Sequence, residues 1–152
     1  HSGGTRNTPH LIAGGARPER VEGKFDAYFS LARVKHIVDA LEAAKDDDWA
    51  QKTAVVLRKR SPLMLHVTLE QIRRARQMGL ADDLRMERDM VHHCFHLRQK
   101  SETVEGIRAL AIDKDHHPKW AHAQLSDVVQ DEWPRFFESP WTSATHPLRH
   151  LN

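Results

Sequence analysis

The sequence has a single cysteine, Cys94, so no intramolecular disulfide can form, as is usual in a reducing compartment. Glycine is scarce after Gly23, and apolar and polar residues do not alternate over the length of a strand, so we expect no β-sheet. No apolar run approaches the roughly 20 residues that a membrane-spanning helix requires. No secretory signal is visible either, and we therefore predict a chain without a membrane segment.

An excess of charge of one sign is also missing. The chain carries 23 basic and 21 acidic residues, for a formal net charge of +2. Basic clusters occur at residues 58–60 and 73–76, but acidic residues lie close by, and neither a recognition-helix motif nor a set of stacking aromatics accompanies them. We therefore predict no nucleic-acid binding. With 39% hydrophobic residues we expect a thin core, which leaves apolar surface for a partner or for a missing part of the same protein.

Apolar residues recur instead at helical spacing. We predict a short helix over residues 19–28 and a second helix that Ser30 caps. The apolar stripe of the second helix comprises Leu31, Val34, Ile37, Val38 and Leu41. The acidic run Asp46-Asp47-Asp48 supplies the cap of a third helix that ends in basic residues 58–60, a polarity that the helix dipole favours. The residues expected to point inward from this third helix are Trp49, Thr53, Val56 and Leu57.

Ser61-Pro62 is typical of a helix start, with serine as the cap and proline in the first turn. We expect this fourth helix to end at Gly79, and its inward residues are Leu65, Leu69, Ile72 and Ala75. A fifth helix over residues 82–98 is expected to bury Leu84, Val91, Cys94 and Phe95, with Met90 beside them. Ser101 caps a sixth helix that carries Val104, Ile107 and Ala111. Pro134 confines a last short helix, over residues 131–138, to its first turn.

These patterns predict an all-α fold of about six to seven helices. Residues 1–17 are rich in Gly, Thr, Pro and Asn and indicate a flexible lead-in or linker, and His1 in place of an initiator methionine indicates a cut chain. The helical domain is expected over residues 18–138. Residues 139–152 form an irregular tail that packs against other parts of the protein.

The chemistry-bearing side chains do not assemble a self-sufficient enzyme. His92 and His96 share a helical face, but no third ligand stands near them in the pattern, so we predict no metal site. Cys94 falls in an apolar stripe, which favours a core role over a nucleophilic thiolate. No nucleophile elbow and no glycine-rich phosphate loop occur. We therefore assign no catalytic residue to this chain.

Residues 105–120 are the most informative segment. A helix ends there and an irregular turn follows, in which Lys114 lies between Asp113 and Asp115 and is expected to be held by them. Pro118 stiffens the turn and Trp120 supplies a large anchor. Such a rigid turn can present the Lys114 ammonium to the phosphates of a nucleotide. A purely structural, salt-bridged turn is an equally good interpretation.

This segment resembles the C-terminal end of the crotonase (enoyl-CoA hydratase/isomerase) superfamily. The matching residues are Glu105-Gly106, Ala109, Asp113-Lys114 and Pro118-Lys119-Trp120, with Leu110 in place of the usual phenylalanine. The form of residues 112–120 is most similar to the 3-hydroxyisobutyryl-CoA hydrolase branch. Upstream support comes from Ser61-Pro62-x-x-Leu65 with Thr68-Leu69-x-Gln71, from Leu84-x-Met86-Glu87 with Cys94, and from Phe29-Ser30 with Val34. The resemblance covers residues 25–137.

The resemblance implies a helical portion that covers an active site, contributes to subunit contacts and places a lysine near the phosphates of coenzyme A. Lys114 occupies the position of that lysine. In this superfamily an N-terminal ββα spiral supplies the oxyanion hole and the catalytic carboxylates, and no residue here matches those motifs. The lead-in, the tail after Glu138 and residues 99–102 depart from the pattern, which leaves hydrolase and hydratase/isomerase both open.

We therefore predict the C-terminal helical segment of an acyl-CoA enzyme, a 3-hydroxyisobutyryl-CoA hydrolase-like thioesterase. The alternatives are an enoyl-CoA hydratase/isomerase and a stand-alone helical protein-interaction module. The implied partners are an N-terminal catalytic domain, an acyl-CoA substrate that brings its own coenzyme A, and further copies of the chain. The implied location is the cytoplasm, or the mitochondrial matrix in a eukaryote.

Overall fold

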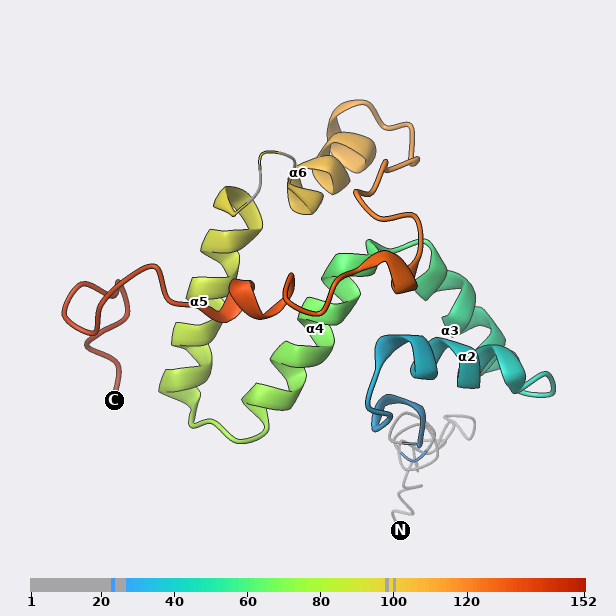
Figure 1. Cartoon of the computed structure of the whole chain (residues 1–152), viewed down its shortest axis with the longest axis horizontal. Helices are drawn as coiled ribbons and strands as arrows, with labels where there is room; N and C mark the ends of the chain where they lie inside the picture. The colour runs from blue at the N-terminus through green and yellow to red at the C-terminus, as the bar shows by residue number, and fades with distance from the viewer. Residues whose placement is uncertain (1–22, 24–26, 98, 100) are drawn as a thin grey trace, which may run out of the picture. The chain divides into compact units, whose positions relative to one another are not determined.

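The computed structural model describes residues 23, 27–97, 99 and 101–152. The chain divides into two compact units, His1–Ser30 and Leu31–Asn152, and the second contains all the elements discussed below. The expected lead-in over residues 1–17 and most of the helix expected over residues 19–28 lie outside the described residues. Every regular element of the described part is helical, which confirms the all-α prediction (Figure 1).

The α-helices of the second unit are α2 (Val34–Ala43), α3 (Asp48–Arg58), α4 (Pro62–Ala75), α5 (Leu80–His96) and α6 (Glu102–Ile107). A π-helical turn, η1 (Arg108–Ile112), extends α6, and two 3-10 turns follow, η2 (Leu125–Asp127) and η3 (Pro134–Phe137). Within the part of the chain that the structure describes, no helix is long and apolar enough to cross a membrane.

Three predicted helix starts are confirmed. Asp47, Ser61 and Ser101 each accept hydrogen bonds from backbone amides two or three residues further on, at 3.1–3.3 Å. These bonds satisfy amides that have no partner within the first helical turn. Pro62 occupies the first turn of α4, where its missing N–H costs nothing. Pro134 likewise opens η3.

Two predicted boundaries are wrong. The helix expected after Ser30 begins only at Val34, after an extended Arg33 whose side chain makes no capping hydrogen bond. Gly79 does not end α4, because that helix stops at Ala75 and unwinds through two tight backbone turns. Gly79 instead precedes α5 in an extended conformation, with φ −73° and ψ 160°. Sequence position alone did not separate a glycine that ends one helix from one that precedes the next.

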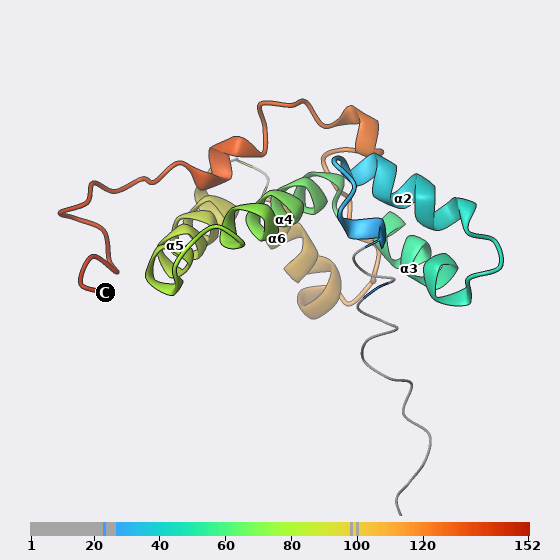
Figure 2. The same cartoon turned by 90° about the horizontal axis from the view of Figure 1, so that it is seen from below.

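The described part of the chain contains two hydrophobic core clusters. One joins Val34 and Val38 of α2 to Leu125, and the other joins α4 to Phe136. The segment from η2 to η3 runs across α4 from the side of α2 toward α5, in both views (Figures 1 and 2). This segment therefore closes both clusters, although it contains little regular structure.

The predicted inward faces of α3 and α5 are wrong in part. On α3, Ala50 and Ala54 are buried, while Val56 is 49% exposed. On α5, Val91 and Phe95 are each 46% exposed and Leu84 is 36% exposed. The face of α5 that packs on the core carries Met86, Met90, Cys94 and Leu97. Helix α5 thus has two apolar stripes, and periodicity did not show which one this chain covers.

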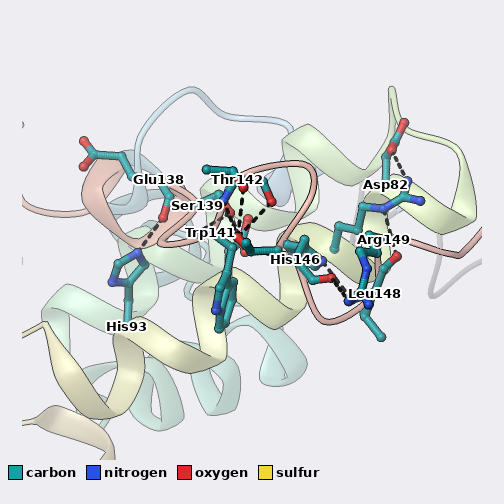
Figure 3. Close-up of polar contacts among 12 residues, drawn as sticks. Asp82, His93, Glu138, Ser139, Trp141, Thr142, His146, Leu148 and Arg149 are labelled. Atoms are coloured by element: carbon teal, nitrogen blue, oxygen red, sulfur yellow. Dashed lines mark hydrogen bonds and ion pairs between the residues drawn. The ribbon is translucent and has the colours of Figure 1, made fainter.

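A third face of α5 holds the segment after η3 through side chains spaced four residues apart (Figure 3). Arg85 donates to the carbonyl oxygens of Leu148 and Leu151. Further along the helix, His93 Nε2 lies 2.5 Å from the carbonyl oxygen of Glu138. Because these partners are backbone oxygens, the segment is held on α5 without helix or strand of its own.

Between these two contacts lies the buried carboxylate of Asp89. Its Oδ1 accepts hydrogen bonds from Ser139 Oγ and from His146 Nε2, both at 3.1 Å. The Leu148 amide donates to His146 Nδ1 at 3.0 Å, so the ring hydrogen resides on Nε2, which faces Asp89. Trp141 packs edge-on against His146. The guanidinium of Arg88 lies over the Trp141 ring, 4.9 Å from its centroid.

Candidate functional site

The irregular turn around Lys114, which the sequence indicated, follows the point where α6 changes from α-helical to π-helical geometry. After the π-helical turn η1, the amide of His116 donates to the carbonyl oxygen of Ala109 at 3.0 Å and ends the helical stretch. Lys114 and His116 both have φ of 56°, in the left-handed region. Two such residues so close together reverse the chain sharply, in a conformation that L-residues other than glycine adopt only at a cost.

Arg108 fixes this reversal. Its guanidinium makes a bidentate pair with Glu105 at 2.8 and 2.9 Å and also donates to Asp113 at 2.6 Å and Asp115 at 2.7 Å. The planar, five-donor guanidinium suits such a multiple contact. A further bond to the carbonyl oxygen of His117, at 3.3 Å, ties the far side of the turn to the same group.

These contacts shift the pKa values of the acids. Hydrogen bonds from Arg108, and then from the Lys119 amide, lower the pKa of Glu105 from 4.5 to about 2. Arg108 is also the main cause of the lowered pKa of Asp115, with the His117 amide second. In each case the ionised carboxylate receives the hydrogen bonds, so both acids stay charged at neutral pH.

Lys114 therefore lies differently from the prediction. Asp113 and Asp115 were expected to hold it, but both carboxylates bond to Arg108 instead. Lys114 is exposed at the tip of the turn, and no carboxylate among the described residues pairs with its ammonium. The turn thus presents a cation on a backbone that a neighbouring arginine holds in place.

A buried network joins this turn to α4. The carboxylate of Glu102, at the start of α6, accepts the hydroxyl of Ser61 at 2.5 Å and the amide of Ala121 at 2.9 Å. Glu102 is only 6% exposed and Ser61 only 4%. A buried carboxylate needs such donors to offset its lost hydration. Sequence reasoning named Ser61 as a cap but missed Glu102 entirely.

Trp120 closes the same region. Its Nε1 donates to the carbonyl oxygen of Lys59 at 3.1 Å. The ring also packs against α6 at Gly106. A Cβ atom added at this glycine would lie 3.4 Å from Cη2 of the indole. The Ser61-Pro62 motif and the Glu105-Gly106 to Trp120 motif, 40 or more residues apart in sequence, are therefore one connected site. The third motif, around Met86-Glu87, lies instead at the α4–α5 contact, where Gln71 bonds to Glu87 at 3.0 Å.

The histidine pair and the cysteine do not add chemistry to this site. The rings of His92 and His96 stack with centroids 4.3 Å apart. Among the residues that the structure describes, no group of three or more potential ligands could hold a metal ion. Burial raises the pKa of the half-buried Cys94 thiol, which disfavours the thiolate.

The structure also brings together a serine, a histidine and an aspartate that the sequence did not suggest. Ser139 and His146 both donate to Asp89, so the carboxylate is the shared acceptor. A nucleophilic triad requires the imidazole between the hydroxyl and the carboxylate, where it can take the hydroxyl proton. The order here is different, and these residues hold the C-terminal segment on α5.

We expect Glu102→Ala to lower the free energy of unfolding by about 2–3 kcal/mol, because the Ser61 hydroxyl and the Ala121 amide lose a charged acceptor in a buried place. Urea denaturation measures this change. Glu138→Ala is the matched control, since its side chain is exposed, and it should change stability by less than about 0.5 kcal/mol. Equal effects of the two substitutions would contradict the role given to Glu102.

The lowered pKa of Glu105 predicts a pH dependence. The ionised side chain is preferred in the folded state, so its stabilisation is complete above pH 4.5 and disappears as pH falls toward about 2. The melting temperature of the wild type should exceed that of Glu105→Gln above pH 4.5, and the difference should shrink on acidification. A difference that stays constant over this range would show that ionisation of Glu105 does not matter.

Comparison with known proteins places these features in a family. A family profile described as enoyl-CoA hydratase/isomerase matches residues 9–137. The chain is 37% identical over 116 residues to probable 3-hydroxyisobutyryl-CoA hydrolase 3 of Arabidopsis thaliana, covering 74% of this chain and 31% of that protein. It is also 36% identical over 109 residues to the small ribosomal subunit protein mS47 of the same plant, covering 70% of this chain and 27% of that protein.

Among solved structures, a carnitinyl-CoA dehydratase from Mycobacterium thermoresistibile superposes with a TM-score of 0.70 at 31% sequence identity. The match covers 82% of this chain and 35% of that one. The chain thus spans about a third of the length of the relatives it matches, and the match falls in their C-terminal part. The chain belongs to the enoyl-CoA hydratase/isomerase family, also known as the crotonase family.

Proposed function

We propose that this chain is the helical C-terminal segment of an acyl-CoA thioesterase that resembles 3-hydroxyisobutyryl-CoA hydrolase. The observation that carries the proposal is the turn around Lys114, an exposed cation on a backbone that Arg108 fixes, in a chain 37% identical to a protein named as such a hydrolase. In this proposal the segment covers the active site, and the catalytic groups lie in an N-terminal domain outside these residues.

In this proposal Lys114 binds a phosphate of coenzyme A. A lysine ammonium is a compact point charge, which suits the rotating oxygens of a phosphate. The pairs of Arg108 with Asp113 and Asp115 hold the left-handed backbone at Lys114 in place. The ammonium therefore keeps its position without a carboxylate partner that would neutralise it. The contact belongs either to the same subunit or to a neighbouring copy in a homo-oligomer. Coenzyme A comes as part of the substrate and is not a resident cofactor.

The exposed stripe of α5 is proposed to pack on the N-terminal domain. Leu84, Val91 and Phe95 lie on one face of the helix and are 36–46% exposed. The match covers only 31% of the length of probable 3-hydroxyisobutyryl-CoA hydrolase 3. A partly exposed apolar helix face is typical of a surface that another domain covers. The proposed location, which follows from the family resemblance, is the cytoplasm, or the mitochondrial matrix in a eukaryote.

Two alternatives rest on specific relatives. The likeness to a carnitinyl-CoA dehydratase favours a hydratase or isomerase of the same family. The likeness to a protein named as part of the small ribosomal subunit favours a stand-alone helical protein-interaction module. Three outcomes separate the three functions: hydrolysis of the thioester bond, hydration or isomerisation of an enoyl-CoA with the thioester left intact, and neither reaction.

The test uses the complete gene product that contains these residues, with 3-hydroxyisobutyryl-CoA as substrate. We expect hydrolysis, and we expect Lys114→Ala to raise KM about tenfold with little change in kcat, because an ammonium–phosphate contact contributes about 1.4 kcal/mol to binding. Lys119→Ala is the matched control, since it removes an exposed lysine five residues away but keeps the amide that bonds Glu105.

Different outcomes separate the claims. Absence of turnover by the wild type, with hydration of an enoyl-CoA in its place, would replace the hydrolase with a hydratase. Equal KM values for Lys114→Ala and the wild type would leave the turn with a structural role only. Residues 1–152 alone should show no turnover, and thioesterase activity there would contradict the assignment of catalysis to another domain.

A further inference from the structure

A second site lies away from the Lys114 turn. A pocket of about 410 Å³ is lined by residues from the start of α2, from α4 and from the segment that crosses α4. Sites for small molecules commonly have volumes of about 300–1,000 Å³. The pocket is therefore large enough for a small organic ligand.

The floor of this pocket is apolar. Val34 and Leu125 are 4% and 8% exposed, and Leu69 packs beside them. At one end the indole of Trp133 stacks on the imidazole of His66, with ring centroids 4.7 Å apart. His66 is itself fixed, because its Nδ1 lies 2.8 Å from the carbonyl oxygen of Pro62. The floor thus offers a rigid surface to an apolar or flat molecule.

The rim is cationic and largely uncompensated. Arg33 and Arg73 line the pocket, and no carboxylate among the described residues pairs with either guanidinium. Arg73 is half-buried, and among the described residues its guanidinium donates to the carbonyl oxygen of Leu31, at 2.8 Å, and to no other group. The one carboxylate in the lining, Glu70, is already paired with Arg74 at 2.7 Å.

We infer that this pocket binds an organic anion, with its phosphate or carboxylate at Arg33 and Arg73 and its apolar body over the floor beside Trp133. A half-buried guanidinium retains donors that a planar anion satisfies two at a time. The apolar floor gains affinity from any part of the ligand that it removes from water. Neither contribution requires thioester chemistry, so the inference stands apart from the proposed function.

Two kinds of anion share this chemistry, namely a nucleotide and a short-chain carboxylate. Isothermal titration of the 152-residue chain with adenosine 3′,5′-bisphosphate, with isobutyrate and with inorganic phosphate distinguishes them. We expect at least one organic anion to bind about tenfold more tightly than phosphate, because phosphate makes no contact with the floor. The tighter of the two organic anions identifies the source.

Substitutions assign the binding to this pocket. Arg33→Gln and Arg73→Gln should each weaken the organic anion about tenfold. Arg33 is exposed and makes no capping bond, so its substitution keeps the fold even if Arg73→Gln does not. Arg76→Gln is the matched control, an exposed arginine next to α4 that does not line the pocket, and it should have no effect.

Three results would overturn the inference. They are no binding of either organic anion at millimolar concentration, equal affinity for inorganic phosphate, and a loss in Arg76→Gln as large as in Arg33→Gln. The first removes the site, the second removes the role of the floor, and the third shows that only overall charge matters.

Discussion

The rest of the site depends on the hydrogen bonds that the buried carboxylate of Glu102 accepts. This carboxylate accepts donors from the start of α4 and from the chain just after the turn, two segments far apart in sequence. Removing it would leave the buried Ser61 hydroxyl and the partly buried Ala121 amide unpaired, and an unpaired buried donor costs more than the net value of its bond. Arg108 fixes the backbone of the turn through its acidic residues, and Trp120 attaches the end of the turn to the carbonyl oxygen of Lys59. The conformation of the turn and its attachment to the start of α4 are therefore determined by different residues.

Only some of the apolar side chains of this chain are buried. Among the described residues, a crossing segment with little helix closes two small core clusters, and one stripe of α5 is 36–46% exposed. The C-terminal segment is held mainly by polar contacts from Arg85, Asp89 and His93. The open apolar face of α5 is the surface that the proposed packing on an N-terminal domain would cover.

Sequence reasoning predicted what local chemistry determines. The caps at Asp47, Ser61 and Ser101 were correct because each needs only a side-chain oxygen and the next helical turn. The inward faces of α3 and α5 were wrong because periodicity finds a stripe but not its partner. Glu102 was missed because its donors lie 41 and 19 residues away, a pairing that no spacing rule reports. The family resemblance located the turn, but not the arginine that shapes it.

We expect the turn around Lys114 to form within residues 1–152, without another domain. Amide hydrogen exchange, measured by NMR on this chain alone, tests this expectation. The amides of Lys119 and Ala121 donate to Glu105 and Glu102, so both should exchange much more slowly than the neighbouring Ala123 amide, for which no acceptor is present among the described residues. Exchange of all three amides at the rate of an unstructured chain would show that the turn does not form by itself.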